Sequence, residues 1–272
     1  MVTARAVRII YGTAWKKANT THLVSTAIQQ GFRGIDTAGQ PKHYDEAGVG
    51  AGVAACLNLA LTRADLYLQS KFTAVSGQDP KNIPYNPKAP LSDQVAQSLA
   101  ASLGNLRTTY LDCLILHSPL ANSKQTLEAW RAMESLVANG DIRSLGISNC
   151  YQLGELQALF DSALIKPSIV QNRFYADTRY DREIRAFCIE QRIIYQSFWT
   201  LTANPHLLAH PAITGLASRY GRTPAQILFR YLTQSDVVPL TGTRSVSHMR
   251  EDLSIFDFEL SAIERDAIHA LL

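Results

Sequence analysis

The sequence predicts an α/β protein of one domain, residues 1–272, in which eight parallel strands close into a barrel surrounded by helices. Its length of 272 residues is close to the roughly 250 that such barrels commonly occupy. Short apolar runs rich in β-branched residues alternate with longer segments of helical period, which is the pattern of repeated βα units. Together these observations predict a (β/α)8 TIM barrel.

Each predicted strand is a short apolar run, and several runs are almost continuously apolar, as strands covered on both faces should be. In chain order, the eight runs lie at Val7–Gly12, Gly34–Asp36, Leu66–Lys71, Leu111–His117, Ser144–Ser148, Ser168–Gln171, Ile193–Phe198 and Val237–Leu240. Because a closed βα barrel needs this number of strands, the count favours a barrel over an open sheet.

Four helices are indicated most clearly between these runs, at Thr21–Gln30, Ser92–Asn105, Thr126–Asn139 and Thr223–Thr233. Ser92 and Thr223 are predicted N-cap residues, because a side-chain hydroxyl there can accept from backbone N–H groups of the first turn. Pro224 suits the first turn, where its missing N–H costs no hydrogen bond.

The structural alternative is a doubly wound open sheet. Such folds usually bind dinucleotides through a GxGxxG segment directly after the first strand. The chain has no such segment, and Gly48, Gly50 and Gly52 follow a helix-like segment instead. The barrel is therefore favoured.

The longest irregular segment is Phe72–Pro90, which contains four prolines. Loops of this length in compact domains often serve a function. The segment directly follows Lys71 at the end of a predicted strand, so we expect it at the catalytic end of the barrel.

Composition excludes several other classes of protein. With 46% hydrophobic and 18% charged residues, the chain is of globular type. A net charge of +3, spread along the chain, predicts no nucleic-acid partner. The four cysteines lack CxxC spacing, so neither a zinc site nor a disulfide framework is predicted. Without a secretory leader or a long apolar run, we expect a cytoplasmic protein with no membrane partner.

Four titratable residues stand at the ends of consecutive predicted strands or in the loops just beyond them. Asp36 ends GFRGID, Tyr44 follows in the next loop, Lys71 ends LYLQSK and His117 ends LDCLILH. Active sites of barrel enzymes are built at these positions. A single strand-end His or Lys is more often structural, so their joint placement carries the prediction. A metal-dependent hydrolase would need more His and acidic ligands, so no metal is expected.

Across nearly its full length the chain resembles the aldo-keto reductases. The matching segments are GTAWK at Gly12–Lys16, GFRGIDTA followed by YDE at Tyr44–Glu46 and Gly48, QSK at Gln69–Lys71, LDCLILHSP through Pro119, GDIRSLGISN at Gly140–Asn149, IVQN around Gln171, and FDFELSAIE near the C-terminus. Chance does not place several independent motifs in the same order. The resemblance implies an NADPH-dependent reductase of an aldehyde or ketone, with a small carbonyl molecule as its partner.

By this resemblance, Asp36, Tyr44, Lys71 and His117 form the catalytic tetrad. Hydride addition to a carbonyl develops negative charge on its oxygen, which must be stabilised and then protonated. Tyr44 would be the general acid, and the Lys71 cation would lower its pKa from an ordinary value of roughly 10. Asp36 would pair with Lys71, and His117 would orient or polarise the carbonyl.

The loop before Tyr44 departs from the family pattern. GQPKH stands between Ala38 and Tyr44, which makes this loop longer than usual. Tyr44 is the candidate acid because the YDEAGVG context follows it, although the longer loop could displace its hydroxyl. The adjacent His43 is the alternative candidate.

The resemblance also implies positions that bind the nicotinamide end of the dinucleotide, namely Gly12, Thr13, Ser148, Asn149, Gln171 and Phe198. Ser148, Asn149 and Gln171 match residues that hydrogen-bond the nicotinamide carboxamide. Phe198 matches the aromatic residue that stacks on the nicotinamide ring. Alone, Ser148 and Asn149 would be a strand-ending turn and Phe198 a core residue.

The segment VPLTGTRSVSHMREDL is similar to the family's loop for the adenosine end, although Leu240 replaces its usual lysine. The implied cofactor residues are Thr241, Gly242, Thr243, Arg244, His248 and Asp252, with Arg250 and Glu251 close by. Arg244, with Arg250 as a second candidate, would pair with an adenosine 2′-phosphate, which favours NADPH, with NADH as the alternative.

The chain stops at Leu272, where many relatives continue into a tail over the substrate, so we expect an open pocket. Its substrate contacts are expected from Trp15, Tyr85 and Trp199. An alternative on the same fold is a non-redox protein, either a nucleotide-sensing subunit or a lyase or cyclase that uses the same acid-base residues. The motifs specify no oligomeric state.

Overall fold

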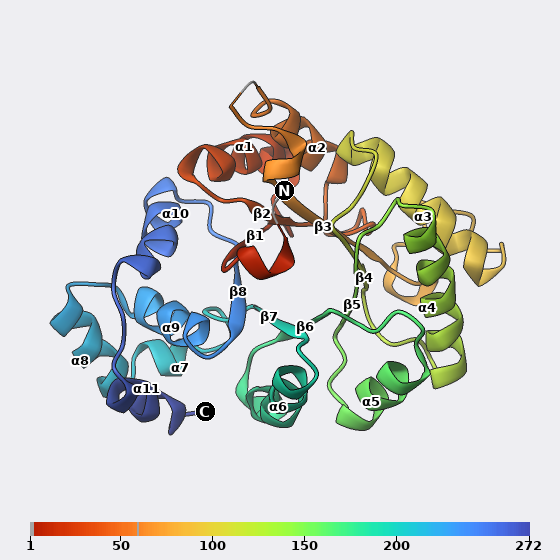
Figure 1. The fold of residues 1–272 in the computed structure, drawn as a ribbon. Helices are drawn as coiled ribbons and strands as arrows, with labels where there is room; N and C mark the ends of the chain where they lie inside the picture. Colours follow the sequence, from red (N-terminus) through yellow and green to blue (C-terminus); the bar gives the residue numbers. More distant parts are fainter. Residues whose placement is uncertain (1–2, 59) are drawn as a thin grey trace.

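The computed structural model describes residues 3–58 and 60–272, apart from the side chain of residue 5, so residues 1, 2 and 59 of the predicted domain lie outside the description. Within the described residues, eight parallel strands form a closed barrel in sequence order, which confirms the predicted fold class (Figure 1). The strands are β1 (Ile10–Gly12), β2 (Gly34–Asp36), β3 (Tyr67–Phe72), β4 (Cys113–Leu116), β5 (Leu145–Ser148), β6 (Ile169–Arg173), β7 (Ile194–Phe198) and β8 (Val237–Thr241). Pairing of Ile10 with Leu240 closes the barrel, so this sheet has no open edge.

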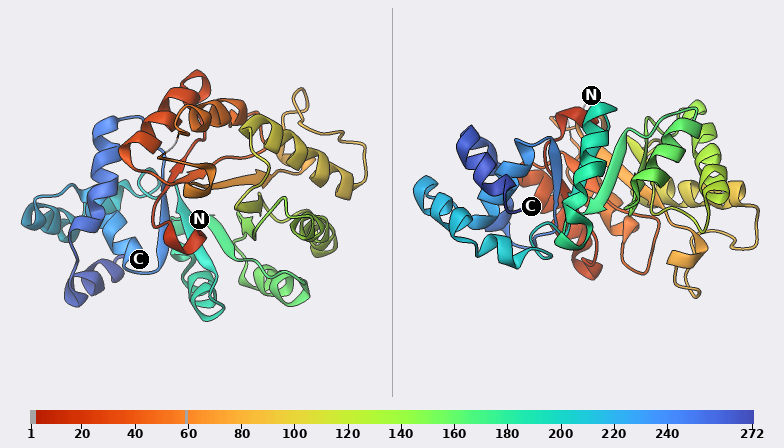
Figure 2. Two further views of the ribbon diagram at one scale, coloured as in Figure 1. Left: turned by 45° about the horizontal axis from the view of Figure 1, so that its top comes forward. Right: turned by 90° about the horizontal axis from the view of Figure 1, so that it is seen from below.

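Helices alternate with the strands and form an outer ring around them (Figures 1 and 2). They are α1 (Thr20–Gln30), α2 (Glu46–Ala54), α3 (Leu91–Leu106), α4 (Ser123–Ala138), α5 (Leu153–Ser162), α6 (Arg182–Glu190), α7 (Pro205–Leu208), α8 (Pro211–Tyr220), α9 (Pro224–Thr233), α10 (Val246–Leu253) and α11 (Ala262–His269). No helix in the described part of the chain is long and apolar enough to cross a membrane.

The predicted helices correspond to α1, α3, α4 and α9 within a few residues. Thr223 caps α9 as predicted, since its side chain accepts from the Gln226 backbone N–H and the Gln226 side chain accepts from the Thr223 N–H. The prediction that Ser92 caps a helix is wrong. α3 begins at Leu91 with Pro90 at its N-cap, and Leu91 packs against the core, which favours this earlier start.

Helix α2 accounts for the GVGAG segment. Its glycines allow α2 to pack closely against both neighbouring helices. A Cβ atom at Gly50 would collide with the backbone of Asn105 and Leu106, and one at Gly52 would lie 2.7 Å from the Thr21 carbonyl oxygen. These glycines therefore allow close helix packing. They lie within α2 and not in a turn of the kind that binds a dinucleotide.

Side chains inside the barrel change from apolar at its amino-terminal end to polar at its carboxyl end. The apolar cluster consists of Val7, Ile10, Tyr67, Cys113, Ile115, Ile169 and Leu240. In β3 the inward positions run from Tyr67 through Gln69 to Lys71, while Leu68 and Phe72 belong to the core between strands and helices. The polar layer lies next to the carboxyl ends of the strands.

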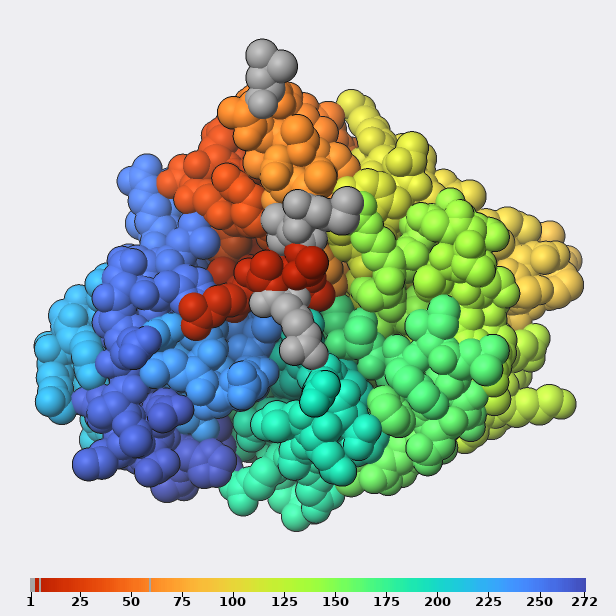
Figure 3. All heavy atoms as spheres, viewed as in Figure 1, coloured from red at the N-terminus to blue at the C-terminus, as the bar shows by residue number. Residues whose placement is uncertain are grey.

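The chain before β1 covers the amino-terminal end of the barrel. The short 3₁₀ helix η1 (Ala4–Ala6) leads into Val7, which packs in the apolar cluster. Figure 3 shows this N-terminal segment lying across the middle of that face. The predicted site residues stand at the opposite end, at the carboxyl ends of the strands.

Candidate active site

A cavity of about 800 Å³ opens at the carboxyl ends of the strands. Most of the predicted site residues line it, namely Gly12, Trp15, Asp36, Tyr44, His117, Ser148, Asn149, Gln171, Phe198, Trp199, Thr241, Gly242, Thr243, Arg244, His248 and Asp252. Lys71 is fully buried in the polar layer of the barrel. Closure of the barrel thus brings together residues that the sequence separates by more than two hundred positions.

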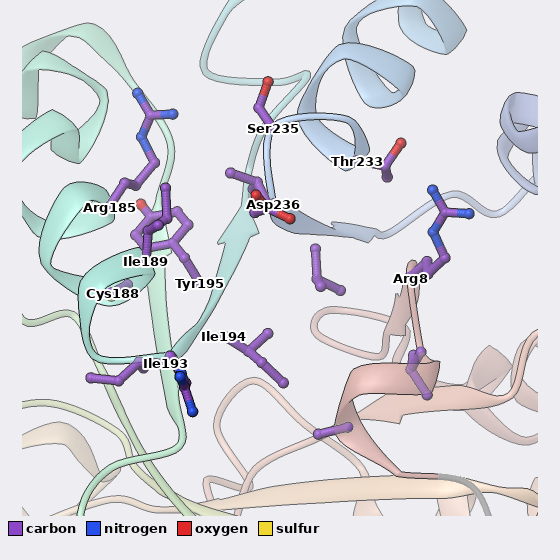
Figure 4. Close-up of a pocket in the computed structure, with 15 residues that line it drawn as sticks. Arg8, Arg185, Cys188, Ile189, Ile193, Ile194, Tyr195, Thr233, Ser235 and Asp236 are labelled. Carbon is purple, nitrogen blue, oxygen red and sulfur yellow. The ribbon is translucent and has the colours of Figure 1, made fainter. Parts of the chain in front are cut away.

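A second cavity, of about 380 Å³, lies near the amino-terminal ends of β7 and β8. Arg8, Ile194 and Asp236 are among its lining residues (Figure 4). None of the predicted site residues is among the described residues that line it. The larger cavity is therefore the candidate active site.

Asp36 and Lys71 form a buried ion pair at the floor of the site. Lys71 Nζ donates to the two carboxylate oxygens of Asp36 at 2.6 and 2.7 Å and to the Thr37 carbonyl oxygen at 2.9 Å. The Lys71 side chain is 1% exposed and the Asp36 side chain is 4% exposed. Burial lowers the pKa of Lys71, but the charges of Asp36 and Tyr44 and their hydrogen bonds raise it, and the net direction is upward. Lys71 is therefore a permanent cation at neutral pH.

Tyr44 lies beside both partners that the prediction assigned to it. Lys71 Nζ is 5.2 Å from the centre of the Tyr44 ring, and the Tyr44 and His117 ring centres are 6.2 Å apart. Burial raises the pKa of Tyr44, and the charge of Lys71 opposes this effect without reversing it. The expected net lowering of this pKa is therefore wrong, because burial outweighs the nearby cation. The hydroxyl is protonated at neutral pH.

The longer loop does not carry Tyr44 away from the site, because several hydrogen bonds hold the loop in place. The backbone N–H groups of His43 and Tyr44 both donate to the Gln40 carbonyl oxygen at 3.0 Å. The Gln40 side chain donates to the Gly77 carbonyl oxygen at 2.7 Å, and Asp45 caps α2. The loop is tied at both ends and against the following β3–α3 segment.

His117 is neutral in this environment. Burial, together with the positive charges of Lys71 and His43, lowers the pKa of His117 to about 3. Its Nδ1 atom lies 2.6 Å from the Thr73 hydroxyl oxygen, and its carbonyl oxygen accepts from the Asn149 side chain at 2.8 Å. A neutral imidazole held in this way can hydrogen-bond a carbonyl oxygen without bringing a second cation beside Lys71.

Residues at the ends of β5, β6 and β7 form one wall of the cavity. Ser148 Oγ donates to the Gln171 carbonyl oxygen at 2.6 Å, and Asn149 Nδ2 lies 3.2 Å from Ser148 Oγ. Asn149 has a φ of 52°, the left-handed conformation that asparagine tolerates better than most residues. Phe198 lines the same wall and is partly exposed to the cavity. This wall combines amide groups with an aromatic face.

The β8–α10 loop forms the opposite end of the cavity and is tied to the β1–α1 loop. Lys16 Nζ donates to the Gly242 carbonyl oxygen, and Arg244 Nη2 donates to the Trp15 carbonyl oxygen. Neither cation has a carboxylate partner within 4.0 Å among the described residues. Two cations whose charges are not neutralised make this end of the cavity suited to an anionic group.

Asp252 also lies at this end, where it is buried. Its Oδ2 atom accepts from the Thr241 hydroxyl at 2.7 Å, and burial raises the pKa of Asp252 to about 6. Asp252 thereby holds Thr241, the last residue of β8, where the β8–α10 loop begins.

Two predicted contact residues do not line the cavity. The Tyr85 side chain is buried and stacks against Phe72, and its hydroxyl donates to the Thr73 carbonyl oxygen at 2.7 Å. Thr13 is fully buried, and its hydroxyl donates to the Asp36 carbonyl oxygen at 2.8 Å. Both predictions are corrected: Tyr85 fastens the β3–α3 segment, and Thr13 fastens the end of β2.

Several further residues line the cavity that sequence reasoning did not assign to it, among them Lys16, Arg173 and His43. Lys16 closes the GTAWK segment, so its place after Trp15 was a usable signal. Arg173 ends β6, and its guanidinium carbon lies 4.3 Å from the centre of the Trp199 ring. No local sequence pattern predicts this contact. His43, considered only as an alternative to Tyr44, packs against Trp15 with ring centres 3.9 Å apart. Contacts between residues far apart in the sequence place Arg173 and His43 in the cavity wall.

The fold is a closed α/β barrel, and a buried Asp–Lys pair, a tyrosine and a neutral histidine meet at the carboxyl ends of its strands. Barrel enzymes build their active sites at this end, so the protein has the architecture of a barrel enzyme. The sequence model of the Aldo/keto reductase family matches residues 8–208. The chain belongs to this family of oxidoreductases.

Named relatives support the same assignment. A glyoxal reductase of Bacillus subtilis (strain 168) is 31% identical, over 92% of this chain and 83% of its own. The methylglyoxal reductase DkgA of Yersinia pestis is 29% identical, over 91% of this chain and 82% of its own. The crystal structure of a Bombyx mori aldo-keto reductase in complex with NADP is similar with a TM-score of 0.81 and 26% identity, covering 97% of this chain and 88% of that chain.

Proposed function

We propose that this protein reduces a small aldehyde or ketone to the alcohol with NADPH, and that Tyr44 is the general acid. The observation that carries the proposal is the position of Tyr44 between the Lys71 cation and the neutral His117, at the floor of the cavity. A protonated hydroxyl beside a fixed cation is the arrangement needed to donate a proton and then stabilise the resulting phenolate.

The residues present fit a dinucleotide phosphate. Lys16 and Arg244 offer positive charge at one end of the cavity, while Ser148, Asn149 and Gln171 offer amide and hydroxyl groups at the other. Arg244 supports a preference for the 2′-phosphorylated dinucleotide.

The protein's part in the reaction follows from these groups. When bound, the dinucleotide supplies the hydride, and the protein supplies orientation and the proton. His117 hydrogen-bonds the carbonyl oxygen and thereby polarises it. Tyr44 gives its hydroxyl proton to that oxygen as negative charge develops, and Lys71 stabilises the phenolate. Asp36 holds the Lys71 ammonium group in position through both of its carboxylate oxygens.

The relatives named glyoxal reductase and methylglyoxal reductase support small α-oxoaldehydes as the substrate class. The rim of the cavity carries Trp15 and Trp199, which are 47% and 48% exposed. Arg173 lies over Trp199, so an apolar surface adjoins a cation that can hydrogen-bond a second carbonyl oxygen.

The test is to follow the near-ultraviolet absorbance of NADPH with glyoxal, methylglyoxal and a panel of simple aldehydes and ketones. We expect substrate-dependent oxidation of NADPH. Tyr44→Phe removes the proton donor and should lower kcat by about 10²- to 10⁴-fold, with the Kd for NADPH unchanged. His43→Phe is the matched control, which retains an aromatic ring at the neighbouring position and should keep most of kcat.

Tight NADPH binding without turnover of any carbonyl compound would contradict the proposal and favour a nucleotide-sensing protein. Full activity of Tyr44→Phe, with loss of activity in His43→Phe, would transfer the role of acid to His43.

A further inference from the structure

Three buried glutamines form a hydrogen-bonded cluster inside the barrel, directly beneath the site. Gln69, Gln171 and Gln196 come from β3, β6 and β7 and are 0%, 2% and 1% exposed. Gln69 pairs in register with Asp36, and Gln171 pairs in register with Gln196. The cluster therefore joins two strand pairs, β2–β3 and β6–β7, across the barrel interior. The proposed proton transfer makes no direct use of Gln69 or Gln196.

The Asp36 carboxylate determines which way these amides point. Its Oδ1 atom accepts from Gln69 Nε2 at 2.7 Å and from Gln171 Nε2 at 3.0 Å, in addition to Lys71 Nζ. An ionised carboxylate accepts hydrogen bonds and cannot donate them. Both glutamines must therefore turn their NH2 groups toward Asp36.

Gln196 receives the remaining N–H of each neighbour. Its Oε1 atom accepts from Gln69 Nε2 at 2.8 Å and from Gln171 Nε2 at 2.9 Å. Its own Nε2 donates to Gln69 Oε1 at 3.0 Å, and this bond fixes the Gln196 amide in turn. Two anchors hold the plane of the Gln171 amide, whereas a single hydrogen bond would leave it free to rotate.

This arrangement leaves Gln171 with one kind of polar group for the cavity. Both of its N–H groups are bound within the protein, and its Oε1 atom accepts no hydrogen bond from the described part of the chain. Gln171 lines the cavity, whereas Gln69 and Gln196 do not. Toward a ligand, Gln171 is thus an acceptor and selects a group that donates an N–H.

We propose that Gln69 and Gln196 are positioning residues that lock the Gln171 amide in the orientation in which its Oε1 accepts from the carboxamide NH2 group of the nicotinamide. This inference rests on the proposed function, because it takes the ligand to be a nicotinamide dinucleotide. Gln69 does not line the cavity, and its side-chain amide is hydrogen-bonded to Asp36 and Gln196, so its effect on cofactor recognition passes through these two residues.

The test compares the binding of two oxidised dinucleotides by quenching of protein fluorescence, with no turnover required. One is NADP⁺, and the other is its 3-acetylpyridine analogue, in which a methyl ketone replaces the carboxamide and no N–H is available. The wild-type protein should prefer NADP⁺. Gln196→Met should reduce this preference by about three- to tenfold, the loss expected for one hydrogen bond, with the Kd for the analogue nearly unchanged.

Gln69→Met should reduce the preference to a similar degree, and it serves as the second variant should Gln196→Met fail to fold. The matched control is Gln94→Met. Gln94 is another buried glutamine, on α3, whose side chain donates to the carbonyl oxygens of Pro87 and Ala89 outside the cluster. It should leave the preference at the wild-type value even where it lowers the thermal unfolding temperature.

An unchanged preference in both cluster variants would overturn the inference. So would a wild-type protein that binds both dinucleotides equally, although that result leaves the proposed function intact. A wild-type protein that binds neither dinucleotide would instead contradict the proposed function itself.

Discussion

At the scale of single residues, Lys16 is the cavity cation whose charge is most sensitive to pH. Burial and the charge of Arg244 lower the pKa of Lys16 to about 8. An anionic phosphate stabilises the protonated amine, so the complex retains a proton that the free protein loses above this pKa. Lys16 is therefore mostly charged at neutral pH, half charged at about pH 8 in the free protein and mostly neutral well above that pH.

We accordingly expect the affinity for NADP⁺ to be constant between about pH 6 and 7 and to weaken as the pH rises through 8. The loss by about pH 9.5 should approach tenfold, the value of one charge-assisted hydrogen bond. Fluorescence titration across this range measures it. Lys16→Met should bind more weakly at pH 7 and show a flat profile; the same pH dependence in Lys16→Met would assign the effect to another group.

Residue identity was easier to predict than residue environment. Asp36, Lys71 and His117 were placed correctly because each lies within one residue of the carboxyl end of a strand, and these strand ends meet at one end of a barrel. The direction of the pKa shift of Tyr44 was predicted wrongly, because it depends on how completely the neighbouring elements exclude water from the hydroxyl.

At the scale of elements, the packing of α2 against its neighbours depends on glycine. Gly50 approaches the backbone of Asn105 and Leu106 at the end of α3, which a side chain would displace. Gly104 stands in α3 itself, and a Cβ atom added there would meet nothing within 4 Å. The two positions thus offer the same substitution with opposite consequences.

Gly50→Ala should lower the free energy of unfolding by about 2 to 3 kcal/mol, because the collision is with backbone atoms that cannot move aside. Gly104→Ala should raise it by about 0.5 to 1 kcal/mol, because alanine loses less conformational entropy in a helix. Urea unfolding measures both. Equal changes in the free energy of unfolding would show that the contact between α2 and α3 does not restrict the size of the residue at position 50.

Periodicity predicted α1, α3, α4 and α9, whereas the start of α3 and the function of the Tyr85 segment were decided by contacts. Leu91 is the first residue of α3 because it packs against the core. Tyr85 points into the protein because its hydroxyl donates to the Thr73 carbonyl oxygen. Neither partner is visible in a local pattern.

At the scale of the whole molecule, the two ends of the barrel serve different purposes. Near the amino-terminal end, the Asp112 carboxylate accepts from Arg63 at 2.9 Å, from Arg143 at 2.8 Å and from the Leu68 backbone N–H at 2.9 Å. Asp112 precedes β4 and is buried, so it joins β3, β4 and the segment before β5. The site residues stand at the other end.

Asp112→Asn should therefore lower the free energy of unfolding by about 2 kcal/mol, a value reduced from that of a fully buried pair because both arginines are partly exposed. The Kd for NADP⁺ should not change. Urea unfolding and fluorescence titration of the same variant test the two statements. Weaker NADP⁺ binding at undiminished stability would show that the two ends are coupled.

The sequence by itself determined the barrel, the strand order and the residues at the strand ends, because alternating apolar runs and helical periods repeat along the chain and each strand contributes its last residues to the same end. Only the tertiary structure decided which side chains face one another. The placement of Lys16 opposite Arg244, the partners of Tyr85 and the amide orientations set by Asp36 all depend on contacts between distant segments. How deeply a side chain is buried, and whether it donates or accepts a hydrogen bond at such a contact, depends on residues from other segments. Neither can be predicted from one segment of the sequence.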